Sequence, residues 1–193
     1  GLEPDQSRTS DTVLPQDTEP QAEVDEDTAG PGITWITWVD DNQGLMWVHG
    51  LELQLMTQLE ARDLCKDLVV DGLGNWRLPS IWELRGLVRG CERIEQGGTC
   101  QIGEPNCVDT SYWNNTTCST CDPGAGPDED TGYYWSEDVP GGQDSIWSGT
   151  IVPDKTDMEH AWYIQFHSGT LFWAPVDELD DGSSTTWGVF CVR

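Results

Sequence analysis

The chain has 193 residues and a formal net charge of −26, with 35 acidic and only 9 basic side chains. An acidic field of this strength repels nucleic acid and anionic lipid surfaces, and the sequence contains no apolar run long enough to cross a bilayer. We therefore expect no nucleic-acid partner and no membrane span, and sulfated or phosphorylated ligands are disfavoured for the same electrostatic reason.

Residues 1–31 form an acidic segment that is rich in Pro, Thr and Ser and contains no aromatic residue. It holds 9 of the 35 acids and 1 of the 9 bases, so residues 32–193 carry 26 acids against 8 bases, a net charge of −18. A segment with so little apolar surface cannot fold alone, which predicts an arm or linker in front of one domain at 32–193. Two roles stay open for this arm: a spacer, with or without O-glycans, or an extended segment that docks on a neighbouring subunit and supports self-association.

The cysteine content indicates an exported protein. Seven cysteines, in a chain with 11 tryptophans and few basic residues, are typical of an oxidising compartment. The sequence starts with Gly1 rather than Met, so we expect a mature product whose export signal or lipid anchor lies upstream, although a recombinant start would look the same. The expected localisation is extracellular or at the cell surface.

The domain is expected to begin with a β-hairpin and an amphipathic helix. Apolar and β-branched residues at 33–39 and 45–48 predict two strands, and the polar segment 40–44 predicts the turn between them. A helix follows from about Met56 to Leu68. The side chains expected to face the core are Met56, Leu59, Leu64, Cys65 and Leu68.

Residues 75–84 contain a complete start signal for a second helix. Ser80 can cap the first turn, and Glu83, three residues later, can reach back to the Ser80 amide in a capping box. The apolar spacing that follows predicts a short buried helix of about 81–89 that ends at Gly90.

The segment 90–130 is a cysteine-rich insertion with few aliphatic residues. A loop of this length without regular structure needs covalent staples, and five cysteines are available: Cys91, Cys100, Cys107, Cys118 and Cys121. Close spacing favours a Cys91–Cys100 bridge. Cys107 would then pair with Cys118 or Cys121, and the leftover cysteine is free or joins another subunit. Two alternatives use the same residues: a zinc site at Cys107, Cys118 and Cys121, and a redox-active Cys118–Cys121 pair.

Strand-like segments return after this insertion. Their positions are 132–136, 146–147, 161–167, 170–174 and 186–193. The segment 167–170 predicts a hairpin turn. The last strand carries Cys191, which favours a strand inside a sheet that is tied to a distant residue.

In this order, the elements and motifs resemble the bacterial family named after the C-terminal domain of the Legionella collagen-like protein. The resemblance covers about residues 33–193. It rests on the segments 44–47, 61–65, 75–84 with Trp-Arg-Leu-Pro-Ser, 134–136 with Tyr-Trp-Ser, 161–169 with Ala-Trp-x-x-x-Phe-x-x-Gly, and 189–193 with Phe-Cys-Val-Arg.

The resemblance implies a fold, a disulfide and a location. The family is similar to C-type-lectin-like domains and to the formylglycine-generating-enzyme fold, which implies an α+β domain with two helices packed on a small antiparallel sheet and a long disulfide-stapled loop region. It also implies a bridge between the first-helix cysteine and the last-strand cysteine, Cys65–Cys191. Family members are mostly secreted or surface-attached. The founder is an adhesin for sulfated glycans, a ligand that the −18 charge disfavours here.

Several residues are candidates for ligand contact. Glu104-Pro105-Asn106 matches the tripeptide with which C-type lectins bind calcium and sugars, since carboxylate and amide oxygens suit both calcium and vicinal hydroxyls; a chance match is the alternative. Three tryptophans outside the family motifs are candidates for stacking on a sugar face: Trp113, Trp147 and Trp173.

Two acidic clusters are candidate calcium sites. Their members are Asp128, Asp130, Asp177, Asp180 and Asp181. Neither cluster follows the EF-hand spacing, and a solvated acidic loop is the alternative reading.

Enzyme signatures are absent from the sequence: there is no Gly-x-Ser-x-Gly, no His-Glu-x-x-His and no phosphate-binding loop. We therefore expect a secreted, non-enzymatic module for recognition or adhesion, with a neutral glycan or a surface protein as partner. The alternative is a structural subunit of an extracellular filament or coat that is held by the arm at 1–31.

Overall fold

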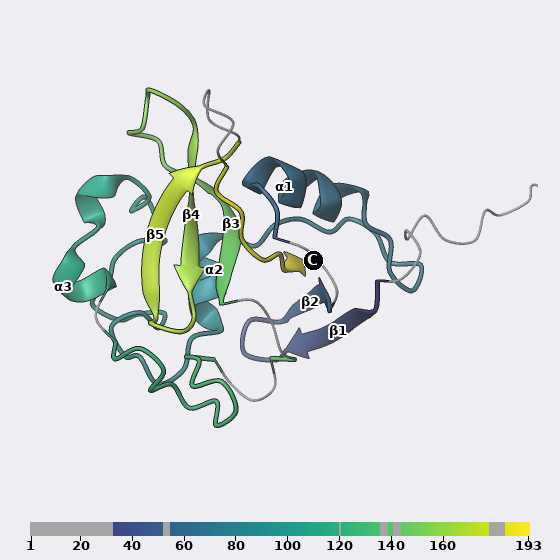
Figure 1. Ribbon diagram of the computed structural model, residues 1–193, viewed down its shortest axis with the longest axis horizontal. Helices are drawn as coiled ribbons and strands as arrows, with labels where there is room; N and C mark the ends of the chain where they lie inside the picture. Colours follow the sequence, from purple (N-terminus) through teal and green to yellow (C-terminus); the bar gives the residue numbers. More distant parts are fainter. Residues whose placement is uncertain (1–32, 52–54, 120, 136–138, 141–143, 178–183) are drawn as a thin grey trace, which may run out of the picture.

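The computed structural model describes residues 33–51, 55–119, 121–135, 139–140, 144–177 and 184–193 (Figure 1). The predicted arm at 1–31 lies outside these ranges, as do Asp180 and Asp181. Within them, the chain forms a mixed α and β domain. No helix in this part of the chain combines the length and the hydropathy that a bilayer crossing requires.

Two small antiparallel sheets form the framework, where the resemblance implied one. The first sheet has the order β1-β2-β6 and consists of β1 (Trp35–Asp40), β2 (Leu45–Gly50) and β6 (Cys191–Val192). The second has the order β3-β4-β5 and consists of β3 (Ser145–Ile151), β4 (His160–Gln165) and β5 (Thr170–Pro175). Both predicted hairpins are confirmed.

The helices are short. They are α1 (Gln58–Asp67), α2 (Ile81–Gly86), α3 (Asn115–Cys118) and a 3-10 turn at Thr110–Tyr112. In Figure 1, α2 lies behind the β3-β4-β5 sheet, and it contacts β3 and β4. This position brings the start of α2 next to the segment 103–108 and to Thr150.

The first helix begins later than predicted. Thr57 caps it in a capping box with Glu60, so it starts at Gln58. Met56 instead exchanges two main-chain hydrogen bonds with Trp187, at 3.0 and 2.9 Å, which holds it outside the helix. Cys65 and Leu68 are buried as expected, whereas Met56, Leu59 and Leu64 are half-buried.

The second helix also ends earlier than predicted, at Gly86 rather than near residue 89. The Arg89 amide donates to the carbonyl of Tyr134 at 2.9 Å, and Val88 forms an isolated bridge with Trp135. These long-range bonds pull the chain away from the helix axis. The same bridge is the only pairing that the described part of the predicted strand 132–136 makes.

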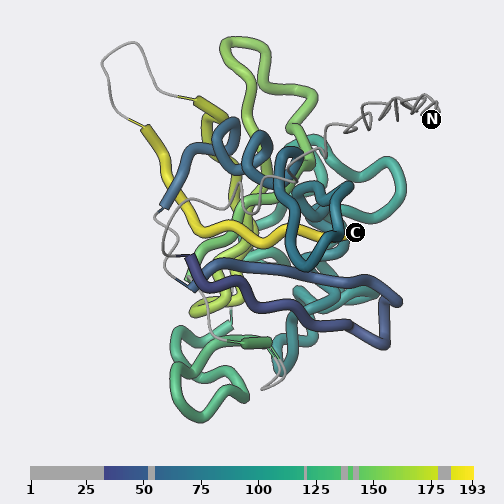
Figure 2. The backbone as a smooth tube through the Cα atoms, turned by 90° about the vertical axis from the view of Figure 1, so that its right-hand side faces the viewer, coloured from purple at the N-terminus to yellow at the C-terminus, as the bar shows by residue number. Residues whose placement is uncertain are grey.

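The C-terminal segment joins the two sheets. Gly188 pairs with Ile146 of β3, and β6 then pairs with β2, with Val48 opposite Cys191. In Figure 2 this yellow segment passes between α1 and the β1–β2 hairpin. The predicted terminal strand is therefore a two-residue strand preceded by isolated bridges, because one segment serves two sheets.

The disulfides confirm one predicted bridge and correct the others. Cys65 and Cys191 are bonded, with Cα atoms 5.5 Å apart, as the resemblance implies. The remaining bridges are Cys91–Cys121 and Cys100–Cys118, and Cys107 is free. The spacing-based pairs were wrong because the insertion folds back on itself, which brings cysteines distant in sequence together. Neither the zinc site nor the redox pair forms, since Cys118 and Cys121 are bonded to different partners.

Candidate functional site

A groove of about 490 Å³ opens beside the first turn of α2. Three separate parts of the chain form its walls: the start of α2, the loop 103–108 and the end of β3. The lining residues are Ser80, Ile81, Trp82, Gly103, Glu104, Pro105, Asn106, Val108 and Thr150. This size lies in the range of small-molecule sites.

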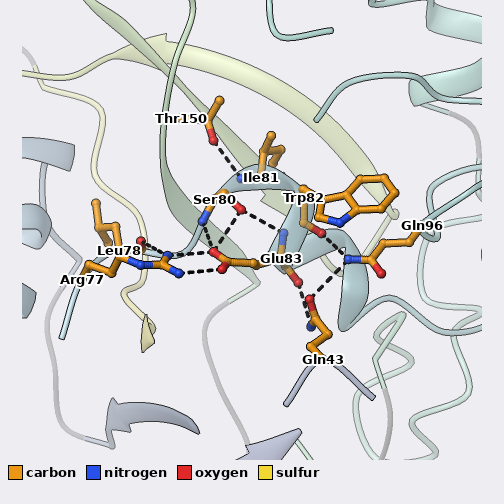
Figure 3. Close-up of polar contacts among 9 residues, drawn as sticks. All are labelled: Gln43, Arg77, Leu78, Ser80, Ile81, Trp82, Glu83, Gln96 and Thr150. Carbon is orange, nitrogen blue, oxygen red and sulfur yellow. Dashed lines mark hydrogen bonds and ion pairs between the residues drawn. The ribbon is translucent and has the colours of Figure 1, made fainter. Parts of the chain in front are cut away.

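The predicted capping box builds the helical wall (Figure 3). Ser80 Oγ accepts from the Glu83 amide at 3.2 Å, and Glu83 Oε2 accepts from the Ser80 amide at 2.6 Å. Arg77 holds the same carboxylate with two bonds of 2.8 and 2.6 Å. Burial raises the pKa of Glu83, but the hydrogen bonds from Arg77 and Ser80 outweigh it, so the pKa lies below its usual value. The carboxylate therefore stays ionised and the helix start is fixed.

Thr150 ties the end of β3 to this wall. Its Oγ1 accepts from the Ile81 amide at 2.9 Å (Figure 3). Its own amide donates to Ser148 Oγ at 3.1 Å, and the neighbouring Gly149 amide donates to the carbonyl of Pro79 at 2.7 Å. These three amides are thus already satisfied within the protein.

A buried guanidinium holds the opposite wall. Arg85 is fully buried and donates to the carbonyls of Ile94, Glu95 and Ile102, at 2.7, 2.8 and 2.6 Å. Burial lowers its pKa to about 10, although Glu104 acts in the opposite direction, so it remains protonated at pH 7. These bonds fasten the disulfide-stapled insertion to α2.

Arg85 also reaches two residues that line the groove. Its Nη1 atom lies 3.9 Å from Glu104 Oε1, and its guanidinium carbon lies 5.3 Å from the centre of the Trp82 ring. The carbonyl of Trp82 accepts from Gln96 Nε2 at 2.8 Å (Figure 3). Trp82 is therefore held in place while it stays half-exposed at the groove.

The loop 103–108 is shaped by a tight turn. The Gly103 amide donates to the carbonyl of Cys107, and the Cys107 amide donates to that of Glu104, both at 2.9 Å. Asn106 has a φ of 68°, in the left-handed region. At Gly103 a Cβ atom would lie 3.0–3.2 Å from Ile81 and Trp82, so only glycine allows this close approach to α2.

The structure brings two predicted ligand residues together and leaves three elsewhere. Glu104 and Asn106 both line the groove. Trp147 is fully buried and donates to the Met56 carbonyl at 2.8 Å, so its prediction as an exposed contact was wrong. The strand around Trp147 faces the core, and the two apolar residues at 146–147 were too short a sequence signal to predict this burial.

Trp113 and Trp173 are half-buried and lie outside the groove. Trp113 donates to the Leu171 carbonyl at 2.7 Å and packs edge-on against Trp173. Lys155 Nζ lies 5.1 Å from the centre of the Trp173 ring. Both indoles thus take part in internal contacts that hold the insertion on β5.

Three of the predicted calcium residues lie in the described part of the chain: Asp128, Asp130 and Asp177. Asp128 accepts from Thr131 Oγ1 at 2.6 Å, from Trp135 Nε1 at 2.8 Å and from the Asp130 amide at 3.1 Å, and the first two bonds lower its pKa. With these bonds Asp128 stabilises the loop in which it lies. Asp130 and Asp177 are exposed. Among the residues that the structure describes, no three His, Cys, Asp or Glu side chains lie close enough to hold a metal ion. Calcium binding stays a prediction.

The sequence interpretation missed Trp82, Arg85 and Thr150 as parts of one site. Trp82 and Arg85 are three residues apart, and this helical spacing places them on one face. An arginine between the apolar residues Leu84 and Leu87, on the core-facing side of the helix, was the available signal. No sequence signal indicated Thr150, because it lies at the groove only once β3 has folded beside α2.

Comparison with known proteins gives one finding. The family model described as the Lcl C-terminal domain matches residues 36–193. No curated protein and no solved structure matches the chain. The family model covers most of the sequence, including both sheets, all three bridges and the groove. The chain therefore belongs to the Lcl C-terminal domain family.

Proposed function

We propose that this protein is a secreted, non-enzymatic recognition module that binds its ligand in the groove beside α2. The observation that carries the proposal is the convergence of Glu104, Asn106 and Trp82 from two distant segments onto one concavity. A small number of polar groups beside an aromatic side chain is the usual composition of a ligand site. The proposed likeness to C-type lectins rests on the resemblance alone.

Family membership and three disulfides are consistent with an extracellular location. The absence of catalysis is part of the proposal and is supported by the groove's composition. Of the lining residues that the structure describes, Glu104 alone is ionisable. General acid–base or nucleophilic catalysis usually needs a second group within hydrogen-bond reach.

A binding screen tests this function. The full chain is immobilised and exposed to panels of bacterial and host glycans and extracellular proteins, and each hit is measured again with Trp82→Ala. The expected result is at least one ligand whose binding falls with the variant while the circular dichroism spectrum is unchanged. If every hit binds the variant equally well, the groove is not the site and the proposal fails.

The alternative is a building block of an extracellular filament. It is favoured by the position of β1, which is the edge strand of its sheet among the described residues and presents an exposed Val39. Edge strands are templates for pairing with another chain. Light scattering on the full chain and on a variant that starts at Gly32 tests this: assembly that requires residues 1–31 would support the alternative, and two monomers would refute it.

A further inference from the structure

We infer that the groove beside α2 binds an uncharged sugar and does so without a metal ion. This inference rests on the proposed function and adds the chemical class of the ligand. Four features of the groove support it: its charge, the polar side chains that it presents, its aromatic surface, and the number of oxygen ligands that it could give to a cation.

The charge of the groove is nearly balanced. Among the described residues that line it, only Glu104 is ionisable; its side chain is 30% exposed, and buried Arg85 lies 3.9 Å away. An anionic ligand would meet Glu104 and a domain with a net charge of −18, without an exposed base in the lining. A cationic ligand would have to compete with Arg85 for the same carboxylate. A ligand without charge meets neither cost.

The polar side chains that the groove presents suit hydroxyls better than a peptide backbone. The amides of Ile81, Gly149 and Thr150 are all taken by internal hydrogen bonds, so no free strand edge is presented there. What the groove offers is the exposed Asn106 amide, which both donates and accepts, beside the Glu104 carboxylate, which accepts. Two such groups separated by one residue match a pair of neighbouring sugar hydroxyls.

Trp82 supplies the apolar contact. Trp82 is half-buried, and the guanidinium carbon of Arg85 lies 5.3 Å from the centre of its ring, so the indole has less rotamer entropy to lose on binding than a free side chain. The C–H groups of a pyranose ring are apolar and slightly positive, and they complement an electron-rich indole surface. The volume of about 490 Å³ limits the ligand to a few sugar units.

The groove is poor in cation ligands. Calcium takes six to eight oxygen ligands, with several from carboxylates, as a general rule. The lining offers one carboxylate, and that carboxylate already faces a guanidinium. Binding should therefore not depend on calcium.

The test uses the full chain and two matched variants. Asn106→Gly removes the amide, and its φ of 68° suits glycine, so the turn is preserved. Asn75→Gly is the control, because Asn75 has a similar φ of 62° and is exposed outside the groove. The probes are immobilised neutral hexose and N-acetylhexosamine oligosaccharides, their sulfated forms, and unstructured peptides, each measured in EDTA and in calcium.

We expect a neutral oligosaccharide to bind equally in EDTA and in calcium and more tightly than its sulfated form. Asn106→Gly should weaken binding about tenfold, the effect of one or two lost hydrogen bonds, while Asn75→Gly leaves it unchanged. Glu104→Gln should reduce the preference for the neutral over the sulfated form several-fold.

Three results would overturn the inference while the proposed function stands: binding that requires calcium, tighter binding of the sulfated form, or groove-dependent binding of peptides only. If no probe binds, or if both glycine variants behave alike, the sugar assignment fails. Loss of the proposed function is a different result, namely hits in the wider screen that Trp82→Ala never affects.

Discussion

Arg85 should be among the most important single side chains for stability. Its guanidinium is fully buried and donates to three main-chain carbonyls, at distances of 2.6–2.8 Å. Replacement by methionine, Arg85→Met, keeps the side-chain length and leaves those carbonyls without donors. Each buried carbonyl that loses its donor costs about 1–3 kcal/mol. Part of this loss is offset, because the variant no longer buries a charged group.

The expected loss of unfolding free energy for Arg85→Met is about 4 kcal/mol. In a domain of this size that lowers Tm by about 10 °C. Urea denaturation followed by tryptophan fluorescence, and a thermal scan by circular dichroism, measure both quantities. Arg62→Met is the control, since the Arg62 side chain is half-exposed and its ion pair within the described residues is with Asp63, at 3.8 Å. It should change stability by less than about 0.5 kcal/mol.

A loss below about 1 kcal/mol for Arg85→Met would refute this reasoning, because it would show that the carbonyls of Ile94, Glu95 and Ile102 find other partners. Equal losses for the two arginine variants would refute it as well. Arg85→Lys gives a further check. One ammonium cannot span three acceptors in the fork that a guanidinium provides, so it should recover less than half of the lost stability.

Three further predictions concern pH, salt and the bridges. Burial lowers the pKa of His49, so the unfolded chain binds a proton before the folded chain does as the pH falls below about 6.5. The free energy of unfolding should therefore decrease from pH 7 to 5.5, by at most about 1.4 kcal/mol per pH unit. In urea titrations His49→Gln should flatten this slope. The net charge of −26 predicts a Tm that rises as NaCl increases from 0.01 to 1 M, where the Debye length falls from about 30 to about 3 Å, and a constant Tm in scanning calorimetry would contradict it. Replacing Cys65 and Cys191 by alanine should lower the free energy of unfolding by about 4–5 kcal/mol, and replacing Cys100 and Cys118 by about 3 kcal/mol. The difference arises because the closed loops span separations of 126 and 18 residues. Equal losses on urea unfolding would argue against the chain-entropy explanation.

Local signals were sufficient to predict the start of α2 and the turn of the first hairpin. The capping box of Ser80 and Glu83 spans four residues, and the turn at 40–44 spans five, so neither depends on the rest of the fold. The bounds of these elements were less predictable. The bond from Arg89 to the carbonyl of Tyr134 ends α2 early, and nothing near residue 89 encodes that contact.

The disulfide pairing shows why sequence distance is a weak guide. Spacing favours Cys91–Cys100, but the structure pairs Cys91 with Cys121, at a separation of 30 residues. Closing a loop that is about three times longer costs only about 1 kcal/mol of entropy. Packing of the buried Cys91 against Gly169, and the three bonds of Arg85, easily outweigh a term of that size. The resemblance succeeded for Cys65–Cys191 because it carries information about the whole fold.

The groove is built so that its lining can change without a change of fold. The helical wall and Thr150 are held by contacts inside the framework, through the capping box and the Ile81 amide. The loop 103–108 is held by the residues that precede it: the carbonyl of Ile102 accepts from Arg85, and Cys100 is fixed by a disulfide. Substitutions at the exposed positions Pro105 and Asn106 should therefore change the lining of the groove while the anchors stay in place. The residues that stabilise the groove differ from those that line its exposed side, so selection can act on the two sets separately.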